Sequence, residues 1–222
     1  MSGLIQSSIA RKVTMALSGL FLVLFLGLHV TINFTSVISP DTFDLWSHFM
    51  GYNLLVQYIM QPILIVGVIV HFVMGFVLEI QNNKARDVKY VKFSGNKNSS
   101  WVSRNMIYSG VAILLFLGIH MYDFWIHEIN YKYIEHLPQD PARYYAETVE
   151  KFVPFWRTLL YVLAFVFLSL HLWHGFASSF QSMGLNNKYT PGLKTFCKIF
   201  AVVVPFVFIF IAVYHHLNPI IH

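Results

Sequence analysis

The sequence predicts an all-α integral membrane protein with five transmembrane helices. Of the 222 residues, 56% are hydrophobic and only 11% are charged, and the mean hydropathy is +0.58. A soluble domain usually carries about a quarter charged residues. Five apolar runs are long enough to cross a bilayer, which takes about 20 residues. We expect these spans at 13–38, 54–80, 104–127, 154–181 and 195–217.

The five spans are expected to be helices, because a backbone in lipid must satisfy its own hydrogen bonds and no alternating barrel pattern occurs. We treat residues 1–222 as a single transmembrane domain. The one cysteine, Cys197, excludes an internal disulfide and a cysteine-built metal cluster. The first apolar run exceeds an ordinary signal-peptide core and lacks a clear cleavage site.

Loop charges predict the orientation in the membrane. Eleven of the 15 basic residues fall on one side: Arg11, Lys12, Lys84, Arg86, Lys89, Lys92, Lys97, Arg104, Lys188, Lys194 and Lys198. Most acids fall on the other: Asp41, Asp44, Asp123, Glu128, Glu135, Asp140, Glu147 and Glu150. Basic loops stay in the cytoplasm, so we expect a cytoplasmic amino terminus and an external carboxy terminus. The net charge of +5 then indicates membrane orientation rather than nucleic-acid binding.

Each of the first four spans carries a histidine well inside its apolar region: His29, His71, His120 and His171. A lone intramembrane histidine is often a neutral residue hydrogen-bonded to a neighbouring helix. Four of them, one per helix, favour a shared role. His29 and His120 lie nine and seven residues from the outer ends of their spans, whereas His71 and His171 each lie 17 residues in. At about 1.5 Å per residue, the two pairs differ in depth by roughly 12–15 Å.

The histidine segments also repeat. Seven of twelve positions are identical between SGLFLVLFLGLH at Ser18–His29 and SGVAILLFLGIH at Ser109–His120. The inner histidines share His-x-x-x-Gly, as HFVMG and HLWHG. Chance similarity between leucine-rich helices and small-residue helix packing are the alternative explanations.

Two imidazoles facing each other across a helical bundle can supply both axial ligands of a haem iron. The pattern therefore favours two haems held by the first four helices. We expect Gly75 and Gly175, one turn after the inner histidines, to let a porphyrin approach the backbone. Gly19 and Gly110 lie ten residues before the outer histidines, about 15 Å deeper, and are expected to make room for the inner haem.

Other metal or transport functions fit less well. One tetrahedral zinc site needs converging ligands, which the depth difference argues against. Two separate two-histidine metal sites would need further carboxylate or thiolate ligands, and the spans offer none nearby. A transporter is disfavoured because the spans lack acids at mid-membrane; Glu79 lies near an inner end.

With these features the chain resembles the cytochrome b membrane-anchor subunit of bacterial succinate dehydrogenase and fumarate reductase, of the five-helix, two-haem type. The resemblance covers essentially the whole chain, including the opening SSIARKVTMALSGLFLVLFLGLH and the run HLWHGFASSFQSMGLNNKYTP. It implies two haem b groups, with His29 and His120 as ligands of the outer haem. His71 and His171 would ligate the inner haem, with His174 as a competitor to His171.

The resemblance also implies partners and a location. The chain would lie in the bacterial cytoplasmic membrane, in lipid, as a respiratory electron-transport subunit without catalytic residues of its own. A flavoprotein that interconverts succinate and fumarate and an iron–sulfur protein would dock on its cytoplasmic face, at the basic loops 84–104 and 184–198. Electrons would pass between these partners and a membrane quinone, with menaquinone implied. A higher oligomer of the complex is also possible in this family.

Quinone reduction takes protons as well as electrons, so its site needs polar groups. The outer residues Asp44, His48, Tyr52, Asn53 and Asp123 are our candidates; the alternative is that they are ordinary polar residues at a wet boundary. The remaining outer histidines are expected to be solvated or interfacial: His127, His136, His215, His216 and His222.

Two rival functions remain open at this point. The first is a di-haem anchor of a hydrogenase or formate dehydrogenase, whose histidines are usually distributed differently among the helices. The second is a non-redox membrane scaffold whose histidines only pack.

Overall fold

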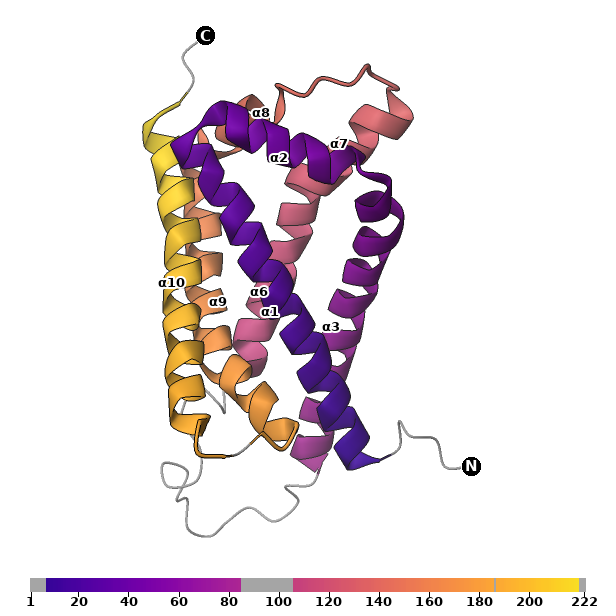
Figure 1. The fold of residues 1–222 in the computed structure, drawn as a ribbon, viewed down its shortest axis with the longest axis vertical. Helices are drawn as coiled ribbons and strands as arrows, with labels where there is room; N and C mark the ends of the chain where they lie inside the picture. The colour runs from indigo at the N-terminus through magenta and orange to yellow at the C-terminus, as the bar shows by residue number, and fades with distance from the viewer. Residues whose placement is uncertain (1–6, 85–105, 186, 220–222) are drawn as a thin grey trace.

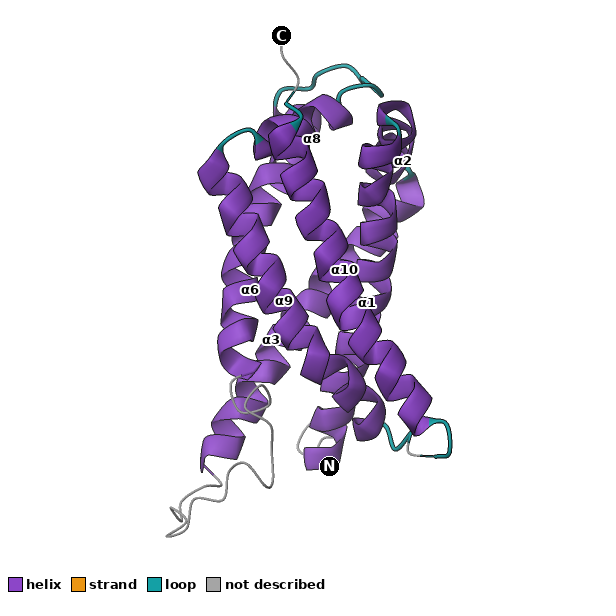
Figure 2. Ribbon diagram, turned by 90° about the vertical axis from the view of Figure 1, so that its left-hand side faces the viewer, coloured by secondary structure: helices purple, strands orange, loops and turns teal. Residues whose placement is uncertain are grey.

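The computed structural model describes residues 7–84, 106–185 and 187–219, and all regular structure within them is helical (Figure 2). Five helical runs in this part of the chain are long and apolar enough to cross a membrane: Ser8–Ile38, Val56–Lys84, Met106–Ile134, Phe155–Ser182 and Thr190–Leu217. The predicted all-α architecture with five apolar spans is confirmed. The observed ends differ from the predicted ends by no more than seven residues.

Three of the runs are single α-helices, and two contain π-helical turns. α1 is Ser8–Ile38, α9 is Phe155–Ser182 and α10 is Thr190–Leu217. The second run is η2, Val56–Met60, followed by α3, Gln61–Lys84. The third comprises α6 (Met106–His120), η3 (Met121–Ile126), α7 (His127–Ile129) and η4 (Asn130–Ile134). Because π-helical turns often occur at functional sites, the turn that starts directly after His120 draws attention to that histidine.

Two shorter helices, which hydropathy does not predict, lie at the acidic end of the bundle. α2, Pro40–Tyr52, crosses that end above the spans, and α8, Tyr144–Phe152, lies beside it (Figure 1). The Ser39 hydroxyl accepts a hydrogen bond from the Thr42 N–H at 3.3 Å, and Pro40 occupies the first helical position. These are ordinary helix-starting signals, and they turn the chain sharply out of α1.

The best-packed region joins α9 to α10. Tyr161 and Phe165 of α9 pack with Phe208 of α10, and the Phe165 and Phe208 rings stack at 5.1 Å. Ala201 is fully buried, and its carbonyl accepts a hydrogen bond from Ser169 Oγ at 2.8 Å. Small residues and interhelical hydrogen bonds are what hold helices together in lipid. α10 therefore packs mainly on α9 and α1, two of the four histidine-bearing spans.

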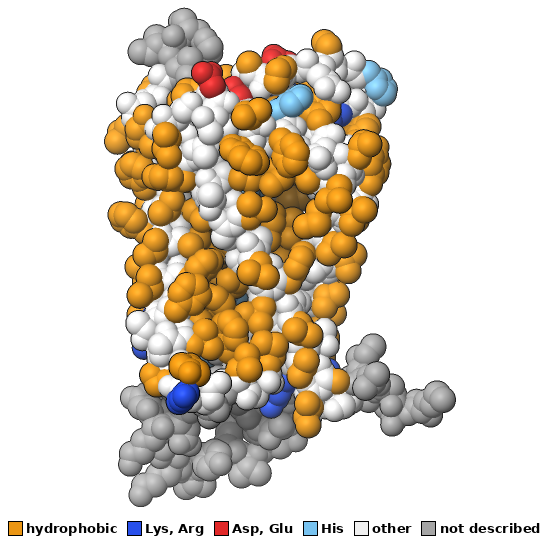
Figure 3. Space-filling view, in the orientation of Figure 1, with side chains coloured by type: hydrophobic (Ala, Val, Ile, Leu, Met, Phe, Trp, Pro, Cys, Tyr) orange, Lys and Arg blue, Asp and Glu red, His pale blue; other side chains and the backbone are white. Residues whose placement is uncertain are grey.

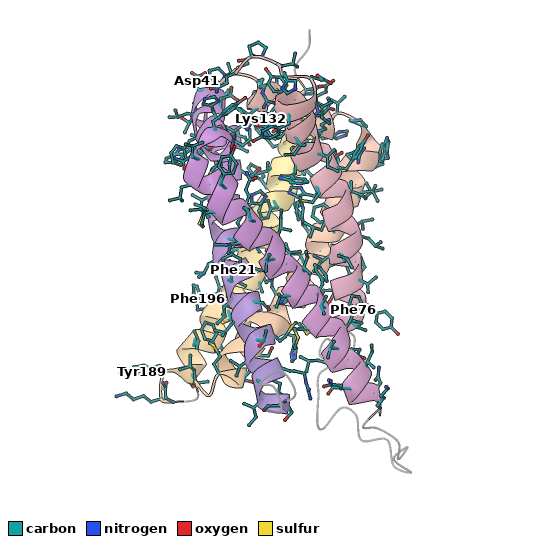
Figure 4. All side chains as sticks on the ribbon, turned by 90° about the vertical axis from the view of Figure 1, so that its right-hand side faces the viewer. Phe21, Asp41, Phe76, Lys132, Tyr189 and Phe196 are labelled. Atoms are coloured by element: carbon teal, nitrogen blue, oxygen red, sulfur yellow. The ribbon has the colours of Figure 1, made fainter. Side chains whose placement is uncertain are left out.

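The outer surface is apolar along its length and charged at its ends (Figure 3). Large side chains point outward, with Leu24 76% and Leu115 68% exposed, as expected for a surface that faces lipid. Figure 4 shows Asp41 and Lys132 at one end of the bundle and Tyr189 at the opposite end. An odd number of spans places the start of α1 and the end of α10 at opposite ends (Figure 1).

Candidate functional site

Two histidines meet in the outer half of the bundle. His29 of α1 and His120 of α6 have ring centroids 5.7 Å apart and ring planes at 85° to each other. Aromatic side chains surround them: Phe116 and Phe124 lie 5.7 and 5.2 Å from His120, and Phe208 lies 5.6 Å from His29. The outer pair thus occupies an apolar, aromatic environment.

A second pair meets deeper in the bundle. His71 of α3 and His171 of α9 have ring centroids 6.2 Å apart and planes at 72°. A Cβ added at Gly19 would lie 3.3 Å from Cε1 of His71, and one at Gly110 would lie 3.7 Å from Cε1 of His171. Both glycines therefore lie beside the inner histidines, and Gly19 leaves little space for a side chain.

The inner histidines each have a serine partner. Ser18 Oγ lies 3.2 Å from Nδ1 of His71, and Ser109 Oγ lies 3.2 Å from Nδ1 of His171. Each serine also donates to the carbonyl oxygen three residues earlier, at 3.0 and 2.8 Å respectively. The repeated Ser-Gly dipeptide therefore contacts one inner histidine in each half of the molecule.

Gly75 and Gly175 face methionines. An added Cβ would lie 3.8 Å from Cε of Met15 at Gly75 and 2.9 Å from Cε of Met106 at Gly175. Close approach of a porphyrin at these two glycines stays a prediction. The competitor ligand His174 is half-buried, but the ring that contacts His71 is that of His171.

The residues present suit a haem iron at each pair. An imidazole nitrogen lies about 2 Å from a bound metal, so two rings on opposite sides of one iron have centroids about 6 Å apart, close to both observed distances. Each of the four histidines is partly buried. A histidine that only packs is expected to form a hydrogen bond to a neighbouring helix. Nδ1 of His120 has no hydrogen-bond partner among the described residues, so no such bond from this atom fixes the ring.

Protein-only metal sites were also sought. Within residues 7–84, 106–185 and 187–219, no group of three or more His, Cys, Asp or Glu side chains is placed to hold a metal ion. The four intramembrane histidines lie instead as two pairs.

The quinone candidates are not gathered around one cavity. Asp44 is buried, and its Oδ1 accepts a hydrogen bond from the Tyr145 N–H at 2.6 Å, which joins α2 to α8. Burial raises the pKa of Asp44, although the hydrogen bond from Tyr145 opposes this. His48 lies 4.6 Å from the Tyr52 ring. Asp44 and His48 line a cavity of about 230 Å³ together with Asp41, Leu45, Pro141 and Ala142.

Asn53 and Asp123 contact other parts of the fold. Oδ1 of Asn53 accepts the backbone N–H groups of residues 55 and 56, at 3.0 and 3.2 Å, and so caps the second span. The buried Asp123 carboxylate accepts hydrogen bonds from Tyr161 at 2.8 Å and Arg157 at 3.2 Å, which joins the third span to α9. The structure thus gives these two side chains structural partners.

Sequence reasoning missed a second cavity, of about 210 Å³, between the second and third spans. Its lining combines apolar and hydrogen-bonding side chains: Gln57, Tyr58, Gln61, Pro62, Ile65, Trp125, Glu128, Ile129, Lys132 and Tyr133, with Gly51. Both Gln57 and Lys132 donate to the Gly51 carbonyl. The sequence signal for this cavity was a pair of glutamines, Gln57 and Gln61, four residues apart at the start of the second apolar span.

A network of charged side chains lies next to this cavity, at the acidic end of the bundle. Glu128 pairs with Lys132 at 2.5 Å and with Arg143, whose Nη1 also contacts both Glu147 carboxylate oxygens at 2.8 Å. Burial lowers the pKa of Arg143, but its hydrogen bonds to Glu147 and Glu128 outweigh burial and raise it. Burial and the nearby Glu128 raise the pKa of Tyr144. The network holds the loop before α8 against the third span.

One expectation for the outer histidines was wrong. His215 is not interfacial: it is 0% exposed, and its Nε2 lies 2.9 Å from Ser36 Oγ. The reason is α8, an unpredicted helix whose Phe152 ring stacks over His215 at 6.4 Å. His216 lies beside it, with Nδ1 2.9 Å from the Phe152 carbonyl. His127 and His136 are exposed, and His222 lies outside the described residues.

The predicted docking loops are only partly described. Of the basic loop 84–104, Lys84 is described and exposed, and the rest lies outside the described residues. In the predicted loop 184–198, Lys188 and Lys194 are exposed, and residues from Thr190 on belong to α10. Tyr189, between these two lysines, lies at the end of the bundle opposite Asp41 (Figure 4).

Comparisons of this chain with protein-family models, with curated proteins and with solved structures found no match.

Proposed function

We propose that this chain is the di-haem cytochrome b anchor of a succinate dehydrogenase or fumarate reductase. The supporting observation is that four intramembrane histidines from four helices meet as two pairs, with centroids 5.7 and 6.2 Å apart. His29 and His120 would hold the outer haem, and His71 and His171 the inner one. A bound haem b supplies one-electron transfer, which the protein tunes through ligation and burial.

The chain itself orients the ligands and excludes water. Phe116 and Phe124 flank His120, and Phe208 packs on His29. Such apolar neighbours keep the local dielectric low, which is one of the levers on haem potential. Gly19 and Gly110 leave the inner rings space next to the backbone.

We place the quinone headgroup in the cavity lined by Gln57, Gln61, Trp125 and Lys132. Apolar walls with a few hydrogen-bonding groups are typical of cofactor sites. Trp125 follows His120 by five residues on the third span, so the cavity lies on the outer side of the outer histidine pair. Asp44, whose pKa is raised, suits the carriage of protons from the outer side. Menaquinone is the quinone that the family resemblance favours.

The electron-donating or electron-accepting partners would bind the basic end. Arg11 and Lys12 lie in the first turns of α1, Lys188 lies between α9 and α10, and Lys194 lies near the start of α10. By the positive-inside rule this end faces the cytoplasm of a bacterium, where a flavoprotein and an iron–sulfur protein would dock.

The test is a reduced-minus-oxidised spectrum of the complex purified through this chain. We expect haem b absorption at two haems per chain, with a co-purified flavoprotein and iron–sulfur protein, and reduction of haem by succinate. No haem would contradict every cytochrome function. Haem with hydrogenase or formate dehydrogenase subunits, and no response to succinate, would instead assign the chain to that other class of anchor.

A further inference from the structure

We infer that Ser18 and Ser109 are positioning residues for the inner histidine pair. Each serine hydroxyl fixes one tautomer and one ring orientation, in which Nδ1 carries the proton and Nε2 keeps the lone pair that binds a metal. The consequence for haem rests on the proposed function, whereas the tautomer of His71 and His171 is independent of it.

The direction of these hydrogen bonds follows from the serine's single proton. Ser18 Oγ donates to the backbone carbonyl three residues earlier at 3.0 Å, and Ser109 Oγ does the same at 2.8 Å. Each oxygen then has only lone pairs left to offer the imidazole nitrogen 3.2 Å away. With the serine proton used in this way, Nδ1 is the donor and Nε2 of the same ring is left unprotonated; at His171 the Met106 carbonyl is a second acceptor for the ring N–H.

Burial makes this arrangement stable. Ser18 is 9% and Ser109 6% exposed, so little water can compete for either oxygen. A ligating histidine usually donates its other ring N–H to a fixed acceptor, which sets its tautomer and makes it a stronger ligand. The two serines provide that acceptor before any metal binds.

The arrangement occurs twice, with one difference: the His171 ring also has the Met106 carbonyl as a hydrogen-bond partner, so Ser18→Ala is the stricter test. α1 supplies a serine to His71 on α3, and α6 supplies one to His171 on α9. In each copy the residue after the serine is a glycine beside Cε1 of the same ring. This gives the Ser-Gly dipeptide of the internal repeat a role: the serine binds one atom of the imidazole and the glycine leaves room for the next.

Among the described residues, the outer pair has no such acceptor. The Asn33 carboxamide nitrogen donates to the His29 carbonyl at 2.8 Å and lies 3.3 Å from His29 Nδ1. Nδ1 of His120 has no hydrogen-bond partner. Loss of a serine should therefore change the inner site alone.

The experiment compares Ser18→Ala and Ser109→Ala with the unaltered complex by redox titration, followed by optical and electron paramagnetic resonance spectra. Loss of the acceptor makes the histidine a weaker donor, which favours ferrous iron. We expect one of the two haems to rise in midpoint potential. The expected change in its reduced-to-oxidised ratio is about tenfold, or about 59 mV for one electron. Ser18→Thr, which keeps a hydroxyl, should restore the original value.

Ser36→Ala is the matched control. Ser36 also donates to the carbonyl three residues earlier, at 2.6 Å, and also contacts a histidine, His215, at 2.9 Å, but lies away from the inner pair. It should leave the inner haem unchanged. The proposed role of the serines would be overturned by any of three results. These are an equal shift of midpoint potential in Ser36→Ala, a shift of both haems in Ser18→Ala or Ser109→Ala, and no shift in these two variants.

A second measurement does not need haem. In the haem-free chain, nitrogen-15 chemical shifts should show His71 and His171 protonated at Nδ1, and Ser18→Ala should convert His71 to a mixture of tautomers. A haem-free natural complex with the expected tautomers would contradict the proposed function and leave this inference standing. Protonation at Nε2 in the unaltered chain would reject the inference itself.

Discussion

At the scale of the residue, the position of His71 in the inner pair depends on the absence of a side chain at Gly19. Gly19 lies so close to His71 that an added Cβ would be 3.3 Å from the ring. Few Cβ atoms approach a neighbour this closely, so a larger side chain must displace the imidazole or the helix. Gly118, on the other repeated helix, has nothing within 4 Å of its Cβ position. The two glycines are therefore a natural comparison.

We predict that Gly19→Leu removes the inner haem, because the new side chain pushes His71 away from His171. Haem per chain should fall from two to one, measured by the pyridine haemochrome assay on the purified complex. Gly118→Leu should retain two haems. Equal haem content in the two variants would show that the approach of Gly19 to His71 does not matter.

The histidines themselves make a sharper prediction. His29→Ala or His120→Ala should lose one haem and spare the other, because the two pairs share no ligand. Haem content and the redox titration should then report a single remaining component, equal in both variants. Two haems retained in either variant would contradict the pairing.

At this scale, the depth of a residue along a helix could be predicted from the sequence. Counting residues placed His29 level with His120 and His71 level with His171, and the structure brings the rings of each together. The burial of His215 could not be predicted, because it depends on a distant segment folding over the end of α10. Contacts between segments far apart in the chain carry no periodic signal.

At the scale of the element, the five spans could be predicted because each is an apolar run of sufficient length. α2 and α8 could not, since both are short and mix polar with aromatic residues. Their position depends on contacts such as Asp44 Oδ1 with the Tyr145 N–H at 2.6 Å. The π-helical turns after His120 were equally hidden, because an extra residue in a turn leaves hydropathy unchanged.

The contact between α2 and α8 should depend on pH. Burial raises the pKa of Asp44, and the charges of Asp41, Asp140 and Glu147 add to this. The folded protein therefore holds this proton more tightly than the unfolded chain. The stabilisation that the protonated Asp44 carboxyl gives to the folded state is complete below its ordinary pKa of 3.8. This stabilisation is lost as the pH rises through the raised pKa of Asp44 in the folded state.

We predict that Asp44→Asn is more thermally stable than the natural protein above that pH window, and that the difference disappears in acid. Asparagine stays neutral and its carbonyl oxygen can still accept from Tyr145. The comparison is a series of melting temperatures in detergent across pH. Glu150→Gln is the matched change of charge, because Glu150 is exposed and is not among the charges that raise the pKa of Asp44. A gain that is the same at every pH would reject the explanation.

At the scale of the whole molecule, charge separates the two ends of an otherwise apolar bundle. The exposed Lys188 directly precedes Tyr189, which lies at the end opposite Asp41 (Figure 4). On the face drawn in Figure 3, the Asp and Glu side chains gather at one end. Because basic segments resist crossing the membrane, this difference predicts which end faces the cytoplasm. The proposed partners and the proposed proton uptake both depend on that orientation.

Cysteine labelling tests the orientation directly. The one native cysteine, Cys197, is 0% exposed, so single additions at exposed sites can be read against it. Gln139→Cys should react with a membrane-impermeant maleimide in intact cells, because residue 139 lies in the exposed loop before α8. Lys188→Cys should react only in permeabilised cells, and the natural chain in neither. The reverse pattern would place the basic end outside, where neither a cytoplasmic flavoprotein nor an iron–sulfur protein could reach it.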